Sequence, residues 1–141
     1  TVKALADAGV PVGVNVAPII PFLNEPEIEQ VVEAAAEAGA RSVHYTVLRL
    51  PWELSPLFRQ WLDQHFPDRA ARVMGRVQEM RQGKDYLAEW GQRMKGEGVW
   101  AELIAQRVNK AVQRAGLNRD RLELDLEGFA PPQQAGQGRL F

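Results

Sequence analysis

The sequence contains no cysteine, and this absence excludes several kinds of site from the chain. A disulfide framework, a thiolate nucleophile, a thiolate zinc site and a cysteine-ligated iron–sulfur cluster all need cysteine side chains. Histidine is scarce too, because His44 and His65 are the only two, so a metal site made of several histidines is also excluded. Since disulfides are rare in the cytoplasm, the lack of cysteine leads us to expect a cytoplasmic protein.

The chain also lacks a strong excess of charge and a long apolar run. Its 141 residues include 17 basic and 18 acidic side chains, so the net charge of −1 argues against a globally basic nucleic-acid binder. The best candidate for a membrane span, residues 10–23, is interrupted by Asn15 and prolines and falls short of the roughly 20 apolar residues required. We therefore expect no membrane association and no signal peptide.

Hydrophobic periodicity predicts a strand–helix–strand unit in the first third of the chain. Residues 10–17 and 42–50 are short runs rich in β-branched side chains, and the first is typical of a strand buried on both faces. Between them, the apolar stripe of residues 28–36 predicts a helix that ends at Gly39. Such a unit implies parallel pairing of the two strands.

From Pro51 onward the periodicity is helical. It predicts a helix that starts near Leu54 and stops at Pro67, a second over residues 70–83 and a third over 99–115. Residues 86–90 carry a weaker helical signal. The alternation of charged and apolar side chains in residues 119–128 predicts a short strand.

Two strands do not make a stable sheet by themselves, and a buried parallel pair leaves both of its edges open. We therefore expect this pair to dock on strands that lie outside the chain, or on another copy of it. The opening residues TVKALADAGV have the pattern of a helix already under way. This pattern favours the first option and predicts that the chain is a fragment.

Near the start of the chain stands the run ADAGVPVGVNVAPIIPFLNEPEIEQVVEAAAEAGARSVHYTVLRLPWEL. This run resembles the last two βα units of a radical S-adenosylmethionine (SAM) partial barrel, of the bacterial branch related to spore photoproduct lyase and described as DNA-repair-photolyase-like. The strings PLFRQWLDQHFPDRAARVMGRVQEMRQGKDY and GQRMKGEG resemble the helical extension of that branch. The fold class expected is therefore α/β, with a barrel fragment in residues 1–53, a helical carboxyl-terminal extension in 54–128 and a flexible tail in 129–141.

The resemblance implies an enzyme that holds a [4Fe–4S] cluster on a Cys-x3-Cys-x2-Cys loop after the first barrel strand. The cluster would cleave SAM reductively to a 5'-deoxyadenosyl radical, in a lyase-like reaction of nucleic-acid repair or modification. This chain departs from the family pattern because it has neither that loop nor any cysteine. Alone it would bind neither cofactor and carry no catalytic or metal-binding residue, and its partner would be the amino-terminal part of the same barrel.

The resemblance also implies a cofactor site near the end of the first predicted strand, with three SAM-binding candidates: Asn15, Pro18 and Ile19. If the strand alternates, Asn15 shares a small and polar face with Gly13 and Ala17. Asn15 would contact the ribose or the methionyl part of SAM, or its amide is satisfied by a neighbouring strand. The loop of residues 18–21 would form an apolar shelf for the adenine, or it is a rigid loop without a ligand role.

Arg49 and Glu53 follow the second predicted strand and are the substrate-binding candidates. A planar guanidinium fits a carboxylate or a phosphate, so Arg49 would contact the SAM carboxylate or a nucleic-acid phosphate, with Glu53 orienting it. The alternative is an ion pair between the two that fixes the turn into the next helix. We expect His44 to be a hydrogen-bonded core residue and His65 a surface residue near a helix end.

A basic cluster lies in the glycine-flanked stretch that contains Arg81, Lys84, Arg93 and Lys95. It would follow a phosphate backbone, with Trp90 or Trp100 available for stacking, or it is simply solvated charge. The near-zero net charge favours the second reading. We expect the four tryptophans to anchor packing between helices rather than to bind bases.

The chain ends in the pentapeptide QGRLF. Its Gln137, Leu140 and Phe141 resemble the short peptide by which bacterial repair proteins dock on the DNA sliding clamp: an apolar pair for a pocket, and an amide that fixes the register. The alternative is a tail without a binding role. Two other functions therefore stay open beside the radical SAM one: a non-catalytic module that docks on the clamp, and a different βα-barrel enzyme in which Glu53 and Asn15 take part in carboxylate chemistry.

Overall fold

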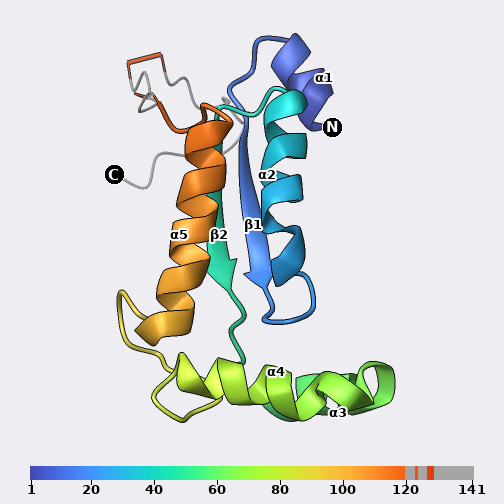
Figure 1. The fold of residues 1–141 in the computed structure, drawn as a ribbon. Helices are drawn as coiled ribbons and strands as arrows, with labels where there is room; N and C mark the ends of the chain where they lie inside the picture. The colour runs from blue at the N-terminus through green and yellow to red at the C-terminus, as the bar shows by residue number, and fades with distance from the viewer. Residues whose placement is uncertain (120–122, 124–126, 129–141) are drawn as a thin grey trace, which may run out of the picture.

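The computed structural model describes residues 1–119, 123 and 127–128, and it shows a mixed α/β arrangement (Figure 1). Its elements, in chain order, are α1 (Val2–Asp7), β1 (Gly13–Ile19), the 3₁₀ helix η1 (Glu25–Glu27), α2 (Ile28–Glu37), β2 (Ser42–Val47), α3 (Leu54–His65), α4 (Pro67–Glu79) and α5 (Gly98–Arg114). β1 and β2 pair in parallel, with Gly13 beside Ser42 and Val16 beside Tyr45. The predicted strand–helix–strand unit is therefore confirmed.

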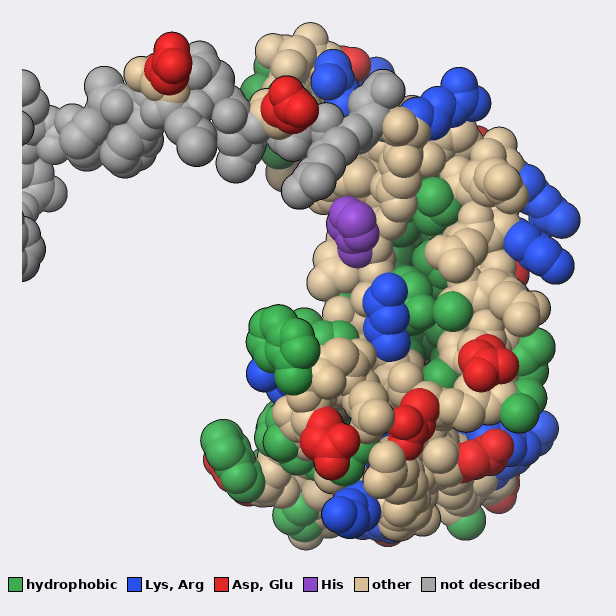
Figure 2. Space-filling view, turned by 90° about the vertical axis from the view of Figure 1, so that its left-hand side faces the viewer, with side chains coloured by type: hydrophobic (Ala, Val, Ile, Leu, Met, Phe, Trp, Pro, Cys, Tyr) green, Lys and Arg blue, Asp and Glu red, His purple; other side chains and the backbone are tan. Residues whose placement is uncertain are grey.

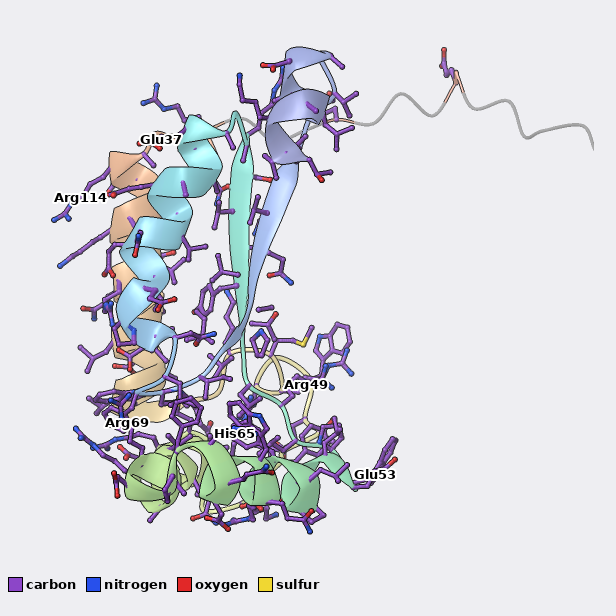
Figure 3. All side chains as sticks on the ribbon, turned by 90° about the vertical axis from the view of Figure 1, so that its right-hand side faces the viewer. Glu37, Arg49, Glu53, His65, Arg69 and Arg114 are labelled. Atoms are coloured by element: carbon purple, nitrogen blue, oxygen red, sulfur yellow. The ribbon has the colours of Figure 1, made fainter. Side chains whose placement is uncertain are left out.

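Two helices, α2 and α5, lie on the same side of the two strands (Figure 3). Because side chains alternate along a strand, one face of the sheet is apolar and packs against these helices. That face consists of Val14, Val16, Val43, Tyr45 and Val47, and it meets Val32 of α2 and Ile104 and Val108 of α5. The carboxyl-terminal helix thus shares one core with the strand–helix–strand unit.

The opposite face of the sheet is open. Gly13, Asn15, Ala17 and His44 are exposed there, and Ser42 and Thr46 are half-buried. Burial of the first strand on both faces was expected from its apolar sequence. That expectation is wrong, because no helix among the described residues packs against this second face.

α3 and α4 lie across the carboxyl ends of the strands (Figure 1) and enclose a second apolar cluster. This cluster consists of Leu48, Leu50, Leu62, Ala70, Val73, Met74 and Val77. The predicted helix from near Leu54 to the stop at Pro67 is confirmed, because α3 ends at His65. α4 then begins at Pro67 itself, since proline is tolerated in the first helical turn. Residues 86–90 form no helix, because the chain there turns back toward β2.

The two outer edges of the sheet differ. The edge of β2 is covered by the side chain of Asn118, which bonds to the nitrogen and the oxygen of Val43 at 2.9 Å each. Further along that edge, the Val47 nitrogen donates to the Met94 carbonyl at 2.9 Å. The outer edge of β1 has no backbone partner among the described residues. One edge is therefore closed by later parts of the chain, and the other is available.

Two predictions concern residues that are not placed. The short strand expected in 119–128 and the tail of 129–141 lie largely or wholly outside the described residues. Among the described helices, none combines the length and the apolar character needed to cross a membrane.

Candidate functional site

The open face of the sheet presents an amide and an imidazole side by side. Asn15 and His44 are register partners in the parallel pair, so their side chains project from the same face. Both are exposed, and within the described part of the chain neither side chain has a hydrogen-bond partner. The expectation of a core position for His44 is wrong. His44 is two residues from the polar Thr46 on the same strand, and this spacing could have predicted that both side chains lie on the open face.

The end of β1 separates two of the predicted SAM-binding residues. Pro18 is exposed, whereas Ile19 is 1% exposed and belongs to the apolar core under α2. The Ile19 side chain offers no surface to a cofactor, so its assignment is wrong. The strand pairing is irregular between Val16 and Ile19, so two exposed residues follow Val16 and Ile19 then turns to the core instead of the open face. The side chain of Asn24 stabilises the backbone at the end of β1: its Nδ2 donates to the Pro18 carbonyl at 2.9 Å, and its Oδ1 accepts from the Ile20 nitrogen at 2.7 Å.

Arg49 and Glu53 do not meet. Figure 3 shows Arg49 below the strands and Glu53 at the far start of α3, pointing away. The Arg49 guanidinium instead donates to the Tyr86 hydroxyl at 3.2 Å and to the Met94 sulfur at 3.4 Å. The predicted ion pair is therefore wrong, because the turn before α3 carries Glu53 outward into solvent.

Arg81 lies behind Arg49 and is the one buried charged residue among those described, with no exposed surface. Its Nη atoms donate to the Leu48 carbonyl at 3.0 Å and to the Gln92 carbonyl at 2.8 Å. Burial, and then the positive charge of Arg49, lower the pKa of Arg81. The Nε atoms of both arginines are buried without a hydrogen-bond partner. Sequence reasoning missed this residue because it grouped Arg81 with solvated charges.

No carboxylate among the described residues pairs with Arg49, Arg81, Arg93 or Lys95. These cations gather around the carboxyl end of β2, where Arg81 bonds to the Leu48 carbonyl, Arg49 to Met94, and Lys95 lies over the Tyr45 ring. Because an anion lowers the cost of holding positive charges together, this arrangement is suited to an anionic ligand.

In the neighbouring helices, an arginine is paired with a carboxylate, that of Asp85. Asp85 accepts hydrogen bonds from Arg59, at 2.7 Å for the closest, from the Ser55 hydroxyl and from the Gln78 amide. The bond from Arg59 is the largest cause that lowers the pKa of Asp85 to about 2. A carboxylate held this firmly in its charged form does not serve as a general acid near neutral pH, so Asp85 ties three segments of the chain together.

A hollow of about 950 Å³ lies at the opposite, amino-terminal end of the strands. It is lined by Gly13, Ser42, His44, Arg41 and Arg119 among others, so it borders the open face but not the cations at the other end. The described residues contain no group of three or more histidine, aspartate or glutamate side chains that could hold a metal ion.

Comparison with models of known protein families, with characterised proteins and with solved structures finds no match for this chain. The chemistry of the site therefore has to be inferred from its own residues and from the sequence resemblance.

Proposed function

We propose that this chain forms part of the wall and the carboxyl-terminal extension of a radical SAM enzyme related to spore photoproduct lyase, acting on nucleic acid. The observation that supports this most is the two-sided sheet: helices cover one face, and small or polar side chains lie on the other. In (β/α) barrels the helices pack outside, and the site lies at the carboxyl ends of the strands. Arg49 follows the carboxyl end of β2, and Asn15 lies on the open face nearer the amino-terminal end of β1.

The unequal sheet edges also support a barrel wall. Asn118 and Met94 close the edge of β2, whereas β1 has no backbone partner on its other side among the described residues. A strand left open on one side gains stability when a further strand pairs with it. In the proposal, preceding barrel strands join at β1, and β2 is the last strand of the barrel.

The two cofactors fit this chain differently. An iron–sulfur cluster does not fit, because it needs thiolate ligands and the chain has no cysteine. SAM fits better: the exposed amide of Asn15 is free to bond to a ribose hydroxyl, Pro18 offers a rigid apolar contact, and Arg49 suits a carboxylate. The cluster, held by another part of the enzyme, would supply the electron that cleaves SAM.

This proposal is tested in the full-length product of the gene. We expect a Cys-x3-Cys-x2-Cys loop upstream of Thr1 and formation of 5'-deoxyadenosine from SAM after anaerobic reduction. Asn15→Ala should weaken SAM binding by about tenfold, the value of one hydrogen bond, while Asn109→Ala on the exposed side of α5 should not. Absence of the loop, or equal SAM affinity in the two variants, would overturn the assignment.

The second candidate is a module that docks on the DNA sliding clamp. It rests on the terminal sequence alone, since Gln137, Leu140 and Phe141 lie outside the described residues. Deleting Leu140 and Phe141 should abolish binding to purified clamp in a surface plasmon resonance measurement, and Gln134→Ala should leave it unchanged. Equal affinity of the deletion variant would remove this candidate.

A further inference from the structure

We propose that a rim of side chains at the carboxyl end of β2 binds single-stranded nucleic acid. The rim, called the Trp–Arg rim here, consists of Trp52, Trp90, Arg49, Arg93 and Lys95. The two tryptophans would stack on bases, and the three cations would hold phosphates. The inference rests on the proposed function, in which the substrate is nucleic acid. It adds that this nucleic acid is single-stranded and names the residues that bind it.

The two tryptophans of the rim are not packing anchors. Trp52 and Trp90 are 85% and 86% exposed, the highest values among the exposed apolar side chains described. Trp52 also has a φ of 45°, a left-handed backbone conformation that is uncommon for a bulky residue. Trp100, by contrast, is half-buried and packs against Phe22 with ring centroids 5.3 Å apart. Indole rings held in water in this way are available to a ligand with a flat apolar face.

Positive charge lies directly beside one of these rings, that of Trp90. The Arg93 guanidinium carbon is 4.5 Å from the centroid of the Trp90 ring, and the Lys95 nitrogen is 5.2 Å from that of Tyr45. Neither side chain forms an ion pair within the described residues, and Arg49 next to them has only a hydroxyl and a thioether as partners. Figure 2 shows two hydrophobic groups projecting from the lower left edge of the molecule, the upper one beside a basic side chain and the lower one beside an acidic side chain.

The segment that carries the rim is fixed in place. The Met94 carbonyl accepts from Val47 of β2 at 2.9 Å, and the Gln92 carbonyl accepts from buried Arg81 at 2.8 Å and from the Gly96 nitrogen at 2.7 Å. The bond from Val47 attaches residues 92–96 to the strand end, and the bond from Arg81 attaches them to the segment after α4. The part of the rim that carries Arg93 and Lys95 is therefore preformed, and a preformed surface binds its ligand without a large ordering cost.

Single strands match this combination better than duplexes or acidic peptides do. Bases in a single strand expose both of their faces, and stacking on aromatic side chains together with phosphate contacts is the usual way in which such strands are bound. In a duplex the base faces are hidden, and an acidic peptide offers charge without flat rings. Arg93 above Trp90 places the two kinds of contact next to each other.

The test measures fluorescence anisotropy of a labelled thymidine oligonucleotide with the 141-residue chain, against a duplex of equal length and polyglutamate. We expect the single strand to bind most tightly, with a slope of log K against log salt of about −2 for three phosphate contacts. Trp90→Ala and Trp52→Ala should each weaken binding about tenfold. Val99→Ala, exposed at the start of α5, and Arg114→Ala, at the other end of the molecule (Figure 3), are matched controls and should bind normally.

Three results would overturn the proposal: no binding of the single strand, equal affinity for the duplex or polyglutamate, or unchanged affinity of the tryptophan variants. The measurement needs no cluster and no SAM. A failure here therefore leaves SAM cleavage by the longer protein unaffected, and a failure of SAM cleavage leaves the binding of single strands unaffected.

Discussion

Arginine side chains occupy two contrasting regions of this molecule. Among the helices, two arginines meet carboxylates of another segment: Arg59 contacts Asp85 at 2.7 Å, and Arg107 of α5 contacts Glu29 of α2 at 2.6 Å. At the carboxyl end of β2, Arg49 and Arg81 have only neutral partners, namely backbone carbonyls, a phenol and a thioether. The same residue type is compensated in one region and uncompensated in the other.

The contrast separates stability from binding. A paired arginine ties two elements together and has little left to offer a ligand. Two guanidinium groups without a carboxylate repel each other and cost folding free energy, so their position at the carboxyl end of β2 is suited to an outside anion that reaches Arg49. The predictions below perturb first the uncompensated region and then the compensated one.

The largest effect is expected for Arg81→Met. The substitution keeps an apolar side chain of similar length but leaves the buried carbonyl of Leu48 without a donor, and the carbonyl of Gln92 with the Gly96 nitrogen alone. Loss of two charge-assisted hydrogen bonds should lower the free energy of unfolding by about 3 kcal/mol in urea titrations. Arg93→Ala, in the exposed rim, should change it by less than about 0.5 kcal/mol. An unchanged free energy of unfolding in Arg81→Met would show that the hydrogen bonds of Arg81 do not stabilise the fold.

The next effect concerns Asp85 and its dependence on pH. Its pKa lies near 2 in the folded protein, against 3.8 as the ordinary value, so the unfolded chain takes up the proton first as the pH falls. This contribution is complete above about pH 4 and is lost as the pH falls from there toward 2. The shift corresponds to about 2 kcal/mol.

Asp85→Asn tests this prediction by chemical denaturation at a series of pH values. The variant should be less stable by about 2 kcal/mol near neutral pH and should lose less stability than the parent as the pH falls toward 2. Asp63→Asn, an exposed aspartate on α3, is the matched control and should keep the parent's pH profile. Parallel pH profiles for parent and Asp85→Asn would contradict the prediction.

The sequence predicted the elements better than it predicted their surroundings. The two parallel strands, the helix between them and the long last helix follow from local periodicity, and all are present. Burial of β1 on both faces was predicted wrongly, because an apolar run of seven or eight residues does not reveal whether a second layer packs on it. Alternation within that run, with Gly13, Asn15 and Ala17 in phase, did carry the correct information about the open face.

The site shows the same limit. Strand parity for Asn15 and proline chemistry for Pro18 correctly predicted accessible positions. The predicted accessibility of Ile19 and the predicted contact between Arg49 and Glu53 were wrong. Which carboxylate an arginine meets depends on the turn between β2 and α3 and on contacts with a loop about 40 residues later in the sequence, as between Arg49 and Tyr86. Such long-range contacts leave no local pattern. The burial of Arg81 was hidden for the same reason.

The smallest effect is expected for Glu29→Gln, which removes one carboxylate from the tie between α2 and α5. The bond from Arg107 is the largest cause that lowers the pKa of Glu29, but the two side chains are 32% and 38% exposed, so water and salt screen the pair. The loss of stability should stay below about 1 kcal/mol and shrink further in high salt, in contrast to the salt-insensitive loss expected for Arg81→Met. Glu33→Gln, exposed one turn later on α2, is the control and should have no effect. If Glu29→Gln lost as much stability as Arg81→Met, the prediction that water and salt weaken the Arg107–Glu29 pair would be contradicted.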